Sequence, residues 1–432
     1  MQTAEAGEQR PRRNWKRTFV FLISILGPGF ITASAGNDVG GIFTYSVAGA
    51  QYGYKILWTM IPIAIALIVV QEMAARMGAV TGKGLAALIR EEFGVWITLL
   101  TMLGLFFMNT FTTSAEFAGI ASASELFGLS RYVAVPLSLG VVFFFVLRVS
   151  GKLVERIFVI LSLVYVTYVI SGFLAHPNWA DVARGTFVPT IDTNDAGYIG
   201  TIVALIGTTI SPYMQFYLQS AVVEKGTRPS GLLGLRIDVV NGSILAIVIA
   251  GFMIIASAAE IFVFNQAHPK AQITANSAAD IAVALKPLAG KFASDLFAFG
   301  ILNAGLFAAA VLPLSTSYLI CEAFGFEAAL DRRFSEAPVF FSLFAIGLVI
   351  GAALVLLPNV PLVKLAIASQ VVQGLLLPLE LVLMLVIINP ARVMGTFRNT
   401  RTANLVCWST VVIVGVIALY YTYTQVAGGG SS

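Results

Sequence analysis

Charged residues are scarce in this 432-residue chain: 11% are Asp, Glu, Lys or Arg, while 58% are hydrophobic. A soluble globular domain carries about a quarter charged residues, so the composition excludes that class. The chain has two histidines, which fall in predicted loops, and two cysteines. Cys321 and Cys407 suit no disulfide or metal framework, and we expect them to pack as small hydrophobic residues. Because HExxH pairs and nucleophile–base pairs are also missing, we predict neither an enzyme nor a bound cofactor.

The chain instead contains long runs of apolar residues. "ILWTMIPIAIALIVV" (56–70) and "VVIVGVIALYYTY" (411–423), together with their flanks, reach the roughly 20 residues that cross a bilayer. Eleven such spans are expected, with centres near residues 33, 67, 111, 140, 165, 209, 250, 306, 348, 375 and 415, and with longer loops at 176–195 and 265–292. We therefore predict an all-α polytopic membrane protein, with a tail at 1–16, one transport domain at 17–425 and a linker remnant at 426–432.

The distribution of basic residues predicts the orientation of the spans. If the N-terminus is cytoplasmic, only seven of the 26 Lys and Arg residues fall outside: Lys55, Arg131, Arg184, Lys270, Lys286, Lys291 and Lys364. Cytoplasmic loops carry the excess of Lys and Arg. With eleven spans, the C-terminus is then extracytoplasmic. Since orientation in a membrane accounts for the net charge of +4, no nucleic-acid partner is needed.

The first span contains "ITASAGNDVGG" (31–41), which places Asp38 and a glycine pair near its middle. An intramembrane carboxylate costs about 2.5–3.5 kcal/mol on insertion scales, and glycine pairs favour unwound backbone. Such backbone survives at membrane depth only inside protein or along a watery cavity. The alternative is a kinked helix whose acid is paired, yet no Lys or Arg lies in the middle of a span to neutralise Asp38.

A second interruption lies in "TIVALIGTTISPYMQFYLQS" (201–220), where Gly207, Thr208, Ser211 and Pro212 break an apolar helix. Interrupted spans at corresponding positions of two halves indicate a midplane site in transporters with inverted repeats. Spans one and six fit an inverted five-plus-five repeat with broken first and sixth helices and one extra final helix. A carboxylate with freed carbonyls and hydroxyls is a set of hard ligands, suited to Mg²⁺, Ca²⁺ or Mn²⁺.

Several segments together resemble the Nramp family of divalent-metal transporters. They are "GPGF" (27–30) followed by Asp38 and "AGAQYGY" (48–54), then "TGKGLAALIREEFG" (81–94), "SQVVQGLLLPLELV" (369–382) and "NPARVMGTFRN" (389–399). The resemblance implies the broken-helix fold of sodium-coupled amino-acid transporters. It also implies inward transport of manganese or iron, usually with protons, the metal being the substrate.

Departures from the family pattern refine that expectation. The family reads Asp-Pro-Gly-Asn in its first helix and Met-Pro-His in its sixth; here the residues are Asp38-Val-Gly-Gly41 and Ser211-Pro-Tyr213. Losing the amide and the thioether leaves a roomier, oxygen-only site, which suits a partly hydrated Mg²⁺ ion and resembles the magnesium-transporting branch of the family. Tyr213 and Gln219 stand where the family has histidines, and Thr113 replaces an aspartate, so we expect little or no proton coupling.

The resemblance assigns roles residue by residue. Asp38 is the charged ligand, Ala35 and Thr208 offer backbone carbonyls, and Gly41 and Ser211 line the enlarged space. Gln370 matches a glutamine near the family's site, although a mid-helix Gln also serves as an interhelical hydrogen bonder. Thr113, Glu116, Tyr213 and Gln219 are candidates for the pathway or for coupling; Glu116 serves a pathway or pairs internally. Glu380 is a second cation attractor or an acid near the headgroups.

Three functions therefore remain open. The first is a transporter of Mg²⁺, and also of Mn²⁺, acting without protons as a monomer in a bacterial inner membrane. The second is an ordinary proton-coupled Mn²⁺ or Fe²⁺ transporter. The third is a cation-coupled amino-acid symporter of the same fold, for which a central acid would repel the substrate carboxylate unless a cation intervened.

Overall fold

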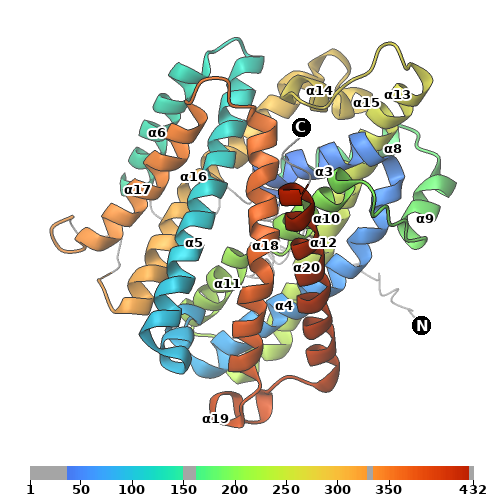
Figure 1. Cartoon of the computed structure of the whole chain (residues 1–432). Helices are drawn as coiled ribbons and strands as arrows, with labels where there is room; N and C mark the ends of the chain where they lie inside the picture. The colour runs from blue at the N-terminus through green and yellow to red at the C-terminus, as the bar shows by residue number, and fades with distance from the viewer. Residues whose placement is uncertain (1–36, 149–161, 328–333, 428–432) are drawn as a thin grey trace, which may run out of the picture.

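The computed structural model describes residues 37–148, 162–327 and 334–427, and in these ranges all regular structure is helical (Figure 1). The longer helices are α3 (Val39–Tyr52), α4 (Met60–Thr81), α5 (Leu85–Leu126), α6 (Arg131–Arg148), α8 (Val166–Leu174), α10 (Ala196–Thr209), α11 (Pro212–Glu224), α12 (Leu232–Ser257), α16 (Ala293–Phe324), α17 (Pro338–Val355), α18 (Leu362–Ile388) and α20 (Arg401–Ala427).

Eight helical stretches of the described residues are long and apolar enough to cross a membrane, and Arg131–Val146 is a shorter one. The prediction of eleven spans is not confirmed as a count. The span expected near residue 33 lies largely outside the described residues, and near residue 165 only Ser162–Tyr165 and α8 are described. The two long loops contain short helices: α9 (Trp179–Phe187) in the first, and α14 (Ala278–Ala282) and α15 (Lys286–Ala289) in the second.

The second expected interruption is present; of the first, only the part from residue 37 onward is described. Asp38 has extended backbone (φ −65°, ψ −177°), and α3 starts immediately after it. The second break separates α10 from α11 at Ile210 and Ser211, where Ser211 is extended (φ −64°, ψ 134°) and Pro212 opens the new helix. Proline is favoured at the first helical position because it has no N–H to leave unpaired.

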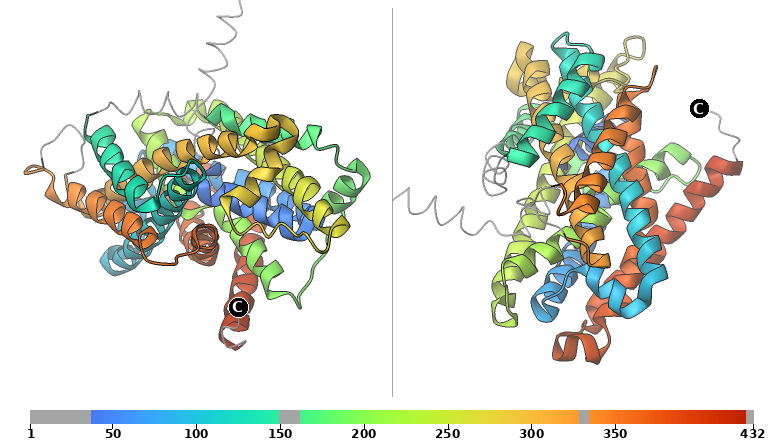
Figure 2. Two further views of the ribbon diagram at one scale, coloured as in Figure 1. Left: turned by 90° about the horizontal axis from the view of Figure 1, so that it is seen from above. Right: turned by 90° about the vertical axis from the view of Figure 1, so that its left-hand side faces the viewer.

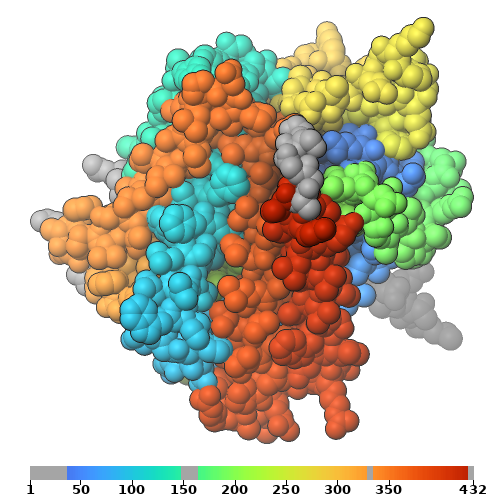
Figure 3. Space-filling model, in the orientation of Figure 1, coloured from blue at the N-terminus to red at the C-terminus, as the bar shows by residue number. Residues whose placement is uncertain are grey.

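Two long helices hold the breaks in place. α5 packs along α16, α17 and α18, and α18 packs against α3, α5, α10 and α20. α5, α18 and α20 lie side by side on the face drawn in Figure 3. α20 leans away from the bundle toward its C-terminal end (Figure 2). It exposes large apolar side chains such as Leu419 and Val412, as expected for a peripheral helix facing lipid.

Side-chain contacts join distant segments at one end of the bundle, which we call the α19 end after α19 (Ala391–Met394). Contacts there connect distant segments: Arg76 with Asn399, Arg236 with Glu72, and Arg392 with Glu92. At the opposite end Arg131 donates to the carbonyl of Val360. Of the loops that the sequence analysis grouped on one side of the membrane, those near Arg76, Arg236 and Arg392 lie together, while positions 152, 156, 332 and 333 lie outside the described residues.

Candidate functional site

Asp38 stands at the N-terminus of α3 and caps it. Its Oδ1 accepts a hydrogen bond from the backbone N–H of Gly41 at 2.7 Å, and its carbonyl accepts from Ile42. An N-cap carboxylate satisfies an otherwise unpaired helix N–H. The side chain is buried, and it takes part in none of the ion pairs formed by the described residues. The cap engages one carboxylate oxygen, and no Lys or Arg side chain of the described residues neutralises the group.

Glu116 joins Asp38 from the middle of α5. Its Oε2 accepts from the backbone N–H of Val39 at 3.3 Å, and the two carboxyl groups lie close enough to interact. Glu116 is fully buried, and its Oε1 has no hydrogen-bond partner among the described residues. Glu116 thus pairs with the start of α3 through one oxygen, and its role in a polar pathway stays a prediction. That pairing puts a second acid beside the first.

The break between α10 and α11 supplies a hydroxyl and backbone carbonyls. Ser211 Oγ donates back toward the carbonyls of Gly207 at 2.8 Å and Thr208 at 3.1 Å. Donating its only hydrogen to α10 leaves the lone pairs of the Ser211 oxygen directed elsewhere. Tyr45 and Thr209 hydroxyls meet at 2.8 Å and tie α3 to the end of α10. The two breaks are thus joined into one polar region.

Gln370 of α18 covers the first turn of α3. A Cβ added at Gly40 would lie 1.8 Å from Gln370 Nε2, so only glycine lets the amide approach this closely. Gly207 allows a second approach, because a Cβ there would lie 2.0 Å from the backbone oxygen of Gln370. Gln370 Oε1 accepts from Gln373 Nε2, which also donates to Thr112 of α5. Gln370 therefore borders the first turn of α3, while its side-chain hydrogen bonds to Ser369 and Gln373 stay within α18; the bond to a second helix is made by Gln373.

A shell of tyrosines around the two acids was not predicted. Tyr45, Tyr165 and Tyr213 are buried, and each interacts electrostatically with Asp38. Tyr165 comes from the 3-10 turn before α8, far from both breaks along the chain. Its only sequence signal was a tyrosine inside an apolar run, which is too common to single out.

Other predicted residues lie elsewhere. Thr113 donates to Asn109 O within α5, and its methyl group packs toward Gly351 of α17. Gln219 donates to Lys83 O at 2.9 Å, at the α19 end of α11. Gly41 is buried and contributes the N–H that Asp38 accepts. Ala35 lies outside the described residues. The structure thus groups Asp38, Gly41, Glu116, Thr208, Ser211, Tyr213 and Gln370, and separates Thr113 and Gln219 from them.

Soft metal ligands are missing from the geometry around the breaks. Among the described residues no group of three or more His, Cys, Asp or Glu side chains could hold a metal ion. Met214, three residues after Ser211, belongs to the apolar core. The described donors at the breaks are carboxylate, hydroxyl and carbonyl oxygens, while Gln370 turns its Nε2 toward Gly40 and its Oε1 toward Gln373. Hard oxygen donors of this kind suit Mg²⁺, Ca²⁺ or Mn²⁺.

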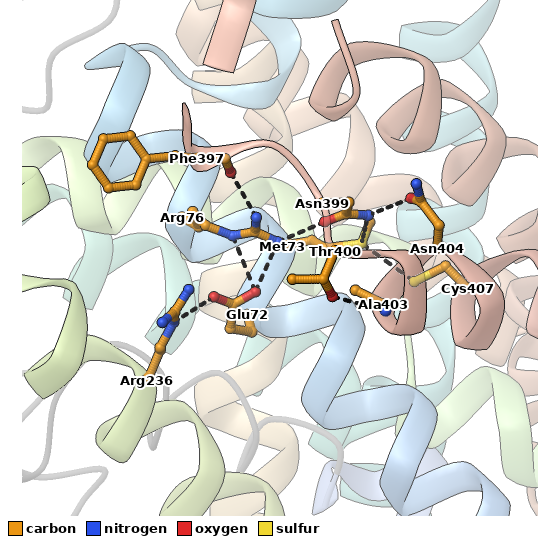
Figure 4. A network of polar contacts seen from close by, with 10 residues as sticks. All are labelled: Glu72, Met73, Arg76, Arg236, Phe397, Asn399, Thr400, Ala403, Asn404 and Cys407. Atoms are coloured by element: carbon orange, nitrogen blue, oxygen red, sulfur yellow. Dashed lines mark hydrogen bonds and ion pairs between the residues drawn. The ribbon is translucent and has the colours of Figure 1, made fainter. Parts of the chain in front are cut away.

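Glu72, another acid of an apolar run, belongs to a structural network (Figure 4). Its carboxylate pairs with Arg76 at 3.0 Å and with Arg236 of α12 at 2.7 Å. Arg76 also donates to the carbonyl of Phe397 and to Asn399 Oδ1, both at 2.6 Å. The network fastens α4 and α12 to the segment before α20, so Glu72 is fully occupied away from the breaks.

Glu380 differs from the expectation of an acid near the headgroups. It lies eight residues before the end of α18 and is 5% exposed. Neither carboxylate oxygen has a hydrogen-bond partner among the described residues.

Comparison with known proteins finds one family over most of the chain. Residues 29–424 match the model described as Nramp, natural resistance-associated macrophage protein-like. The chain is 28% identical over 405 residues to a divalent metal cation transporter MntH of Klebsiella pneumoniae, covering 91% of this chain and 92% of that protein. It is 26% identical over 417 residues to the MntH of Yersinia pestis, covering 94% and 95%.

Solved structures agree on the fold. A manganese transporter of Eremococcus coleocola superimposes with a TM-score of 0.72 at 22% identity, covering 98% of this chain and 91% of that one. MhsT in complex with L-phenylalanine superimposes with a TM-score of 0.51 at 13% identity, covering 92% and 98%. At these identities the likeness concerns the architecture of the helical bundle alone.

Proposed function

The chain belongs to the Nramp family, and from that premise we propose that it carries divalent metal ions, Mg²⁺ and also Mn²⁺, into the cytoplasm. The ion is the substrate, and it moves down its own electrochemical gradient without protons. The observation that carries the proposal is the set of oxygen donors that the described residues place at the two breaks, built around an acid that forms no ion pair with a described Lys or Arg. The relatives are named as divalent metal cation transporters, and the proposal keeps that class of substrate. It prefers Mg²⁺, whereas the similar solved structure is named a manganese transporter.

Three helix ends meet the two breaks. The C-terminus of α10 directs its last carbonyls to the break, and a helix C-terminus carries partial negative charge. The N-termini of α3 and α11 have the opposite sign: Asp38 caps α3 and Glu116 accepts from Val39, while Ser211 makes no side-chain cap for α11. The attraction for a cation therefore rests on the two acids. The acids Asp38 and Glu116 would supply charge and ligands, directly or through water.

The preference for Mg²⁺ rests on Gly41 and Ser211. Mg²⁺ dehydrates reluctantly and keeps several waters, so it needs room and hydrogen-bond acceptors more than soft ligands. Gly41 contributes no side chain, and Ser211 contributes a small hydroxyl. Gln370 and Thr208 border the same space with an amide and a carbonyl. A thioether, which would favour a transition metal, has no counterpart at position 211.

The absence of proton coupling is proposed on the identity of Tyr213, Gln219 and Thr113. None of them titrates near neutral pH as histidine does, and Gln219 and Thr113 are engaged with backbone carbonyls. We also propose the wider setting: one transport domain at 17–425, acting as a monomer in a bacterial inner membrane, with the α19 end cytoplasmic.

Reconstitution tests the function directly. Purified chain in proteoliposomes that enclose a fluorescent Mg²⁺ indicator should show Mg²⁺ influx above that of empty liposomes. An enclosed pH dye should stay unchanged during that influx. Manganese influx accompanied by acidification, with no Mg²⁺ influx, would instead establish the proton-coupled Mn²⁺ or Fe²⁺ alternative. Uptake of labelled amino acid that depends on a cation gradient would establish the symporter.

A further inference from the structure

Three buried side chains near the middle of the molecule have polar atoms that nothing in the described structure satisfies. Gln71 of α4, Gln215 of α11 and Glu380 of α18 are at most 5% exposed. Both polar atoms of each side chain lack a hydrogen-bond partner among the described residues. Buried polar groups are nearly always paired, and leaving one unpaired costs on the order of 1–3 kcal/mol. Three such groups on neighbouring helices need a physical reason.

The helix contacts bring Gln71 and Gln215 to one region. α4 and α11 run together toward the α19 end, with Gly78 packed on Gln219 and Val222. Moving back two helical turns from Gly78 reaches Gln71, and moving back one turn from Gln219 reaches Gln215. Residues three, four and seven apart share one face of a helix. Both amides therefore lie on the faces where α4 and α11 meet, just beyond the break at Ser211.

Glu380 faces the interior from α18, which packs against α4, α5 and α11. Gln373 shows the direction of this face, since it donates to Thr112 of α5 and to Gln370. Seven residues correspond to almost two full turns, so Glu380 points the same way as Gln373 and lies about 10 Å nearer the α19 end. A line of polar residues, Gln370, Gln373 and Glu380, thus runs along α18 away from the Asp38 site.

We propose that Glu380, Gln71 and Gln215 form a second cation site, on the α19 side of the Asp38 site, that holds a hydrated divalent metal ion. The Glu380 carboxylate supplies the charge, and the two amides bind the water shell or the ion through oxygen. Glu380 forms no ion pair with the described Lys and Arg residues, so no described basic side chain occupies the place that we assign to the ion. The inference rests on the proposed function in one respect: the same ion would use both sites in turn.

Counting bound Mn²⁺ tests this site without any transport assay. Free Mn²⁺ gives a sharp electron paramagnetic resonance signal that bound Mn²⁺ does not, so titration of the purified full chain yields the number bound. We expect two Mn²⁺ per chain for the unmodified protein, and one each for Glu380→Gln and Asp38→Asn. Glu125→Gln is the matched control, because Glu125 pairs with Arg131 at the opposite end; it should still bind two.

The outcomes separate this inference from the proposed function. If Glu380→Gln binds as many Mn²⁺ ions as the unmodified chain, the second site is overturned. If Glu380→Gln loses one ion while Asp38→Asn loses none, the second site stands and the Asp38 site fails. Should Glu380→Gln not yield monodisperse protein, Gln71→Leu with Gln215→Met serves in its place. That pair should weaken the second site roughly tenfold or more, as loss of supporting groups does at metal sites, and unchanged titration would count against the proposal.

Discussion

Ser211 lies between α10 and α11, and its small hydroxyl is the side-chain group that this break presents to a metal ion. The hydroxyl donates to Gly207 O and Thr208 O, so it supports the end of α10 as well as bordering the site. A side chain placed here therefore changes both the chemistry of the donor and the space around the ion.

Ser211→Met should move the preference from Mg²⁺ toward Mn²⁺. A thioether is a soft ligand that favours transition metals, and its bulk would exclude part of the water shell that Mg²⁺ retains. The expected change in the ratio of Mg²⁺ to Mn²⁺ uptake is on the order of tenfold, measured in proteoliposomes with both ions present.

Ser211→Ala is the control for this substitution. It removes the hydroxyl without adding sulfur, so it should slow uptake of both ions and leave their ratio near that of the unmodified chain. An equal shift in both variants would show that the hydroxyl, and not ligand softness, sets the preference.

The site could be predicted from the sequence only where local chemistry decided the structure. Asp38, Ser211 and Pro212 predicted the breaks. Proline removes a backbone donor that a helix needs, and a carboxylate is costly inside a membrane-spanning helix. Glu116 is 77 residues from Val39 along the chain, and its approach to Asp38 depends on how α5 packs against α3. Tyr165 lies near Asp38 for the same reason: its position depends on how distant segments pack together. Gln219 lies outside the site, because its position along α11 places it beside Lys83 at the α19 end.

At the scale of helices, α4 is held by a network in which two arginines pair with the Glu72 carboxylate. The two differ in how far they are buried. Arg76 is 5% exposed and has three acceptors, Glu72, Phe397 O and Asn399. Arg236 is 51% exposed and donates to Glu72. The network crosses from α4 to the segment preceding α20, so it fixes the α19 end of the bundle (Figure 4).

Arg76→Gln should therefore destabilise the protein far more than Arg236→Gln. Removing one partner of a buried ion pair costs about 3–5 kcal/mol, whereas an exposed pair contributes about 0–1 kcal/mol. Thermal unfolding of the two variants in detergent checks this expectation. Equal transition temperatures would mean that the contacts of Arg76 add nothing beyond those of a surface pair.

Helix boundaries were easier to predict than the count of spans. The breaks at Asp38 and Ser211 and the long apolar helices α12, α16 and α18 lie where hydropathy placed them. The two long loops were not predicted to contain helices, because α9, α14 and α15 are short and depend on packing against the bundle. The number of spans stays a prediction, since those near residues 33 and 165 are described only in part.

At the scale of the whole molecule, charge divides the bundle into two ends. The contacts at the α19 end join loops of Arg76, Lys83, Arg236 and Arg392, while Arg131 lies at the opposite end. Cytoplasmic loops retain Lys and Arg, and the count over the whole sequence predicts that the α19 end faces the cytoplasm.

Labelling in intact cells tests that orientation. A membrane-impermeant thiol reagent should modify a Lys270→Cys variant and leave an Arg398→Cys variant unmodified until the cells are opened. Cys321 and Cys407 are buried, so the background should be low. Modification of the Arg398→Cys variant in intact cells, with the Lys270→Cys variant protected, would reverse the orientation.

The central claim is that the charge of Asp38 binds the transported ion, beyond its role as a helix cap. Asparagine caps a helix as well as aspartate does, so Asp38→Asn keeps α3 in place and removes only the charge. The decisive measurement is Mg²⁺ influx into proteoliposomes for Asp38→Asn beside the unmodified chain, with equal thermal stability confirmed first. We predict that influx falls to the level of empty liposomes. Influx at the unmodified rate would show that Asp38 serves only the helix, and would contradict the account.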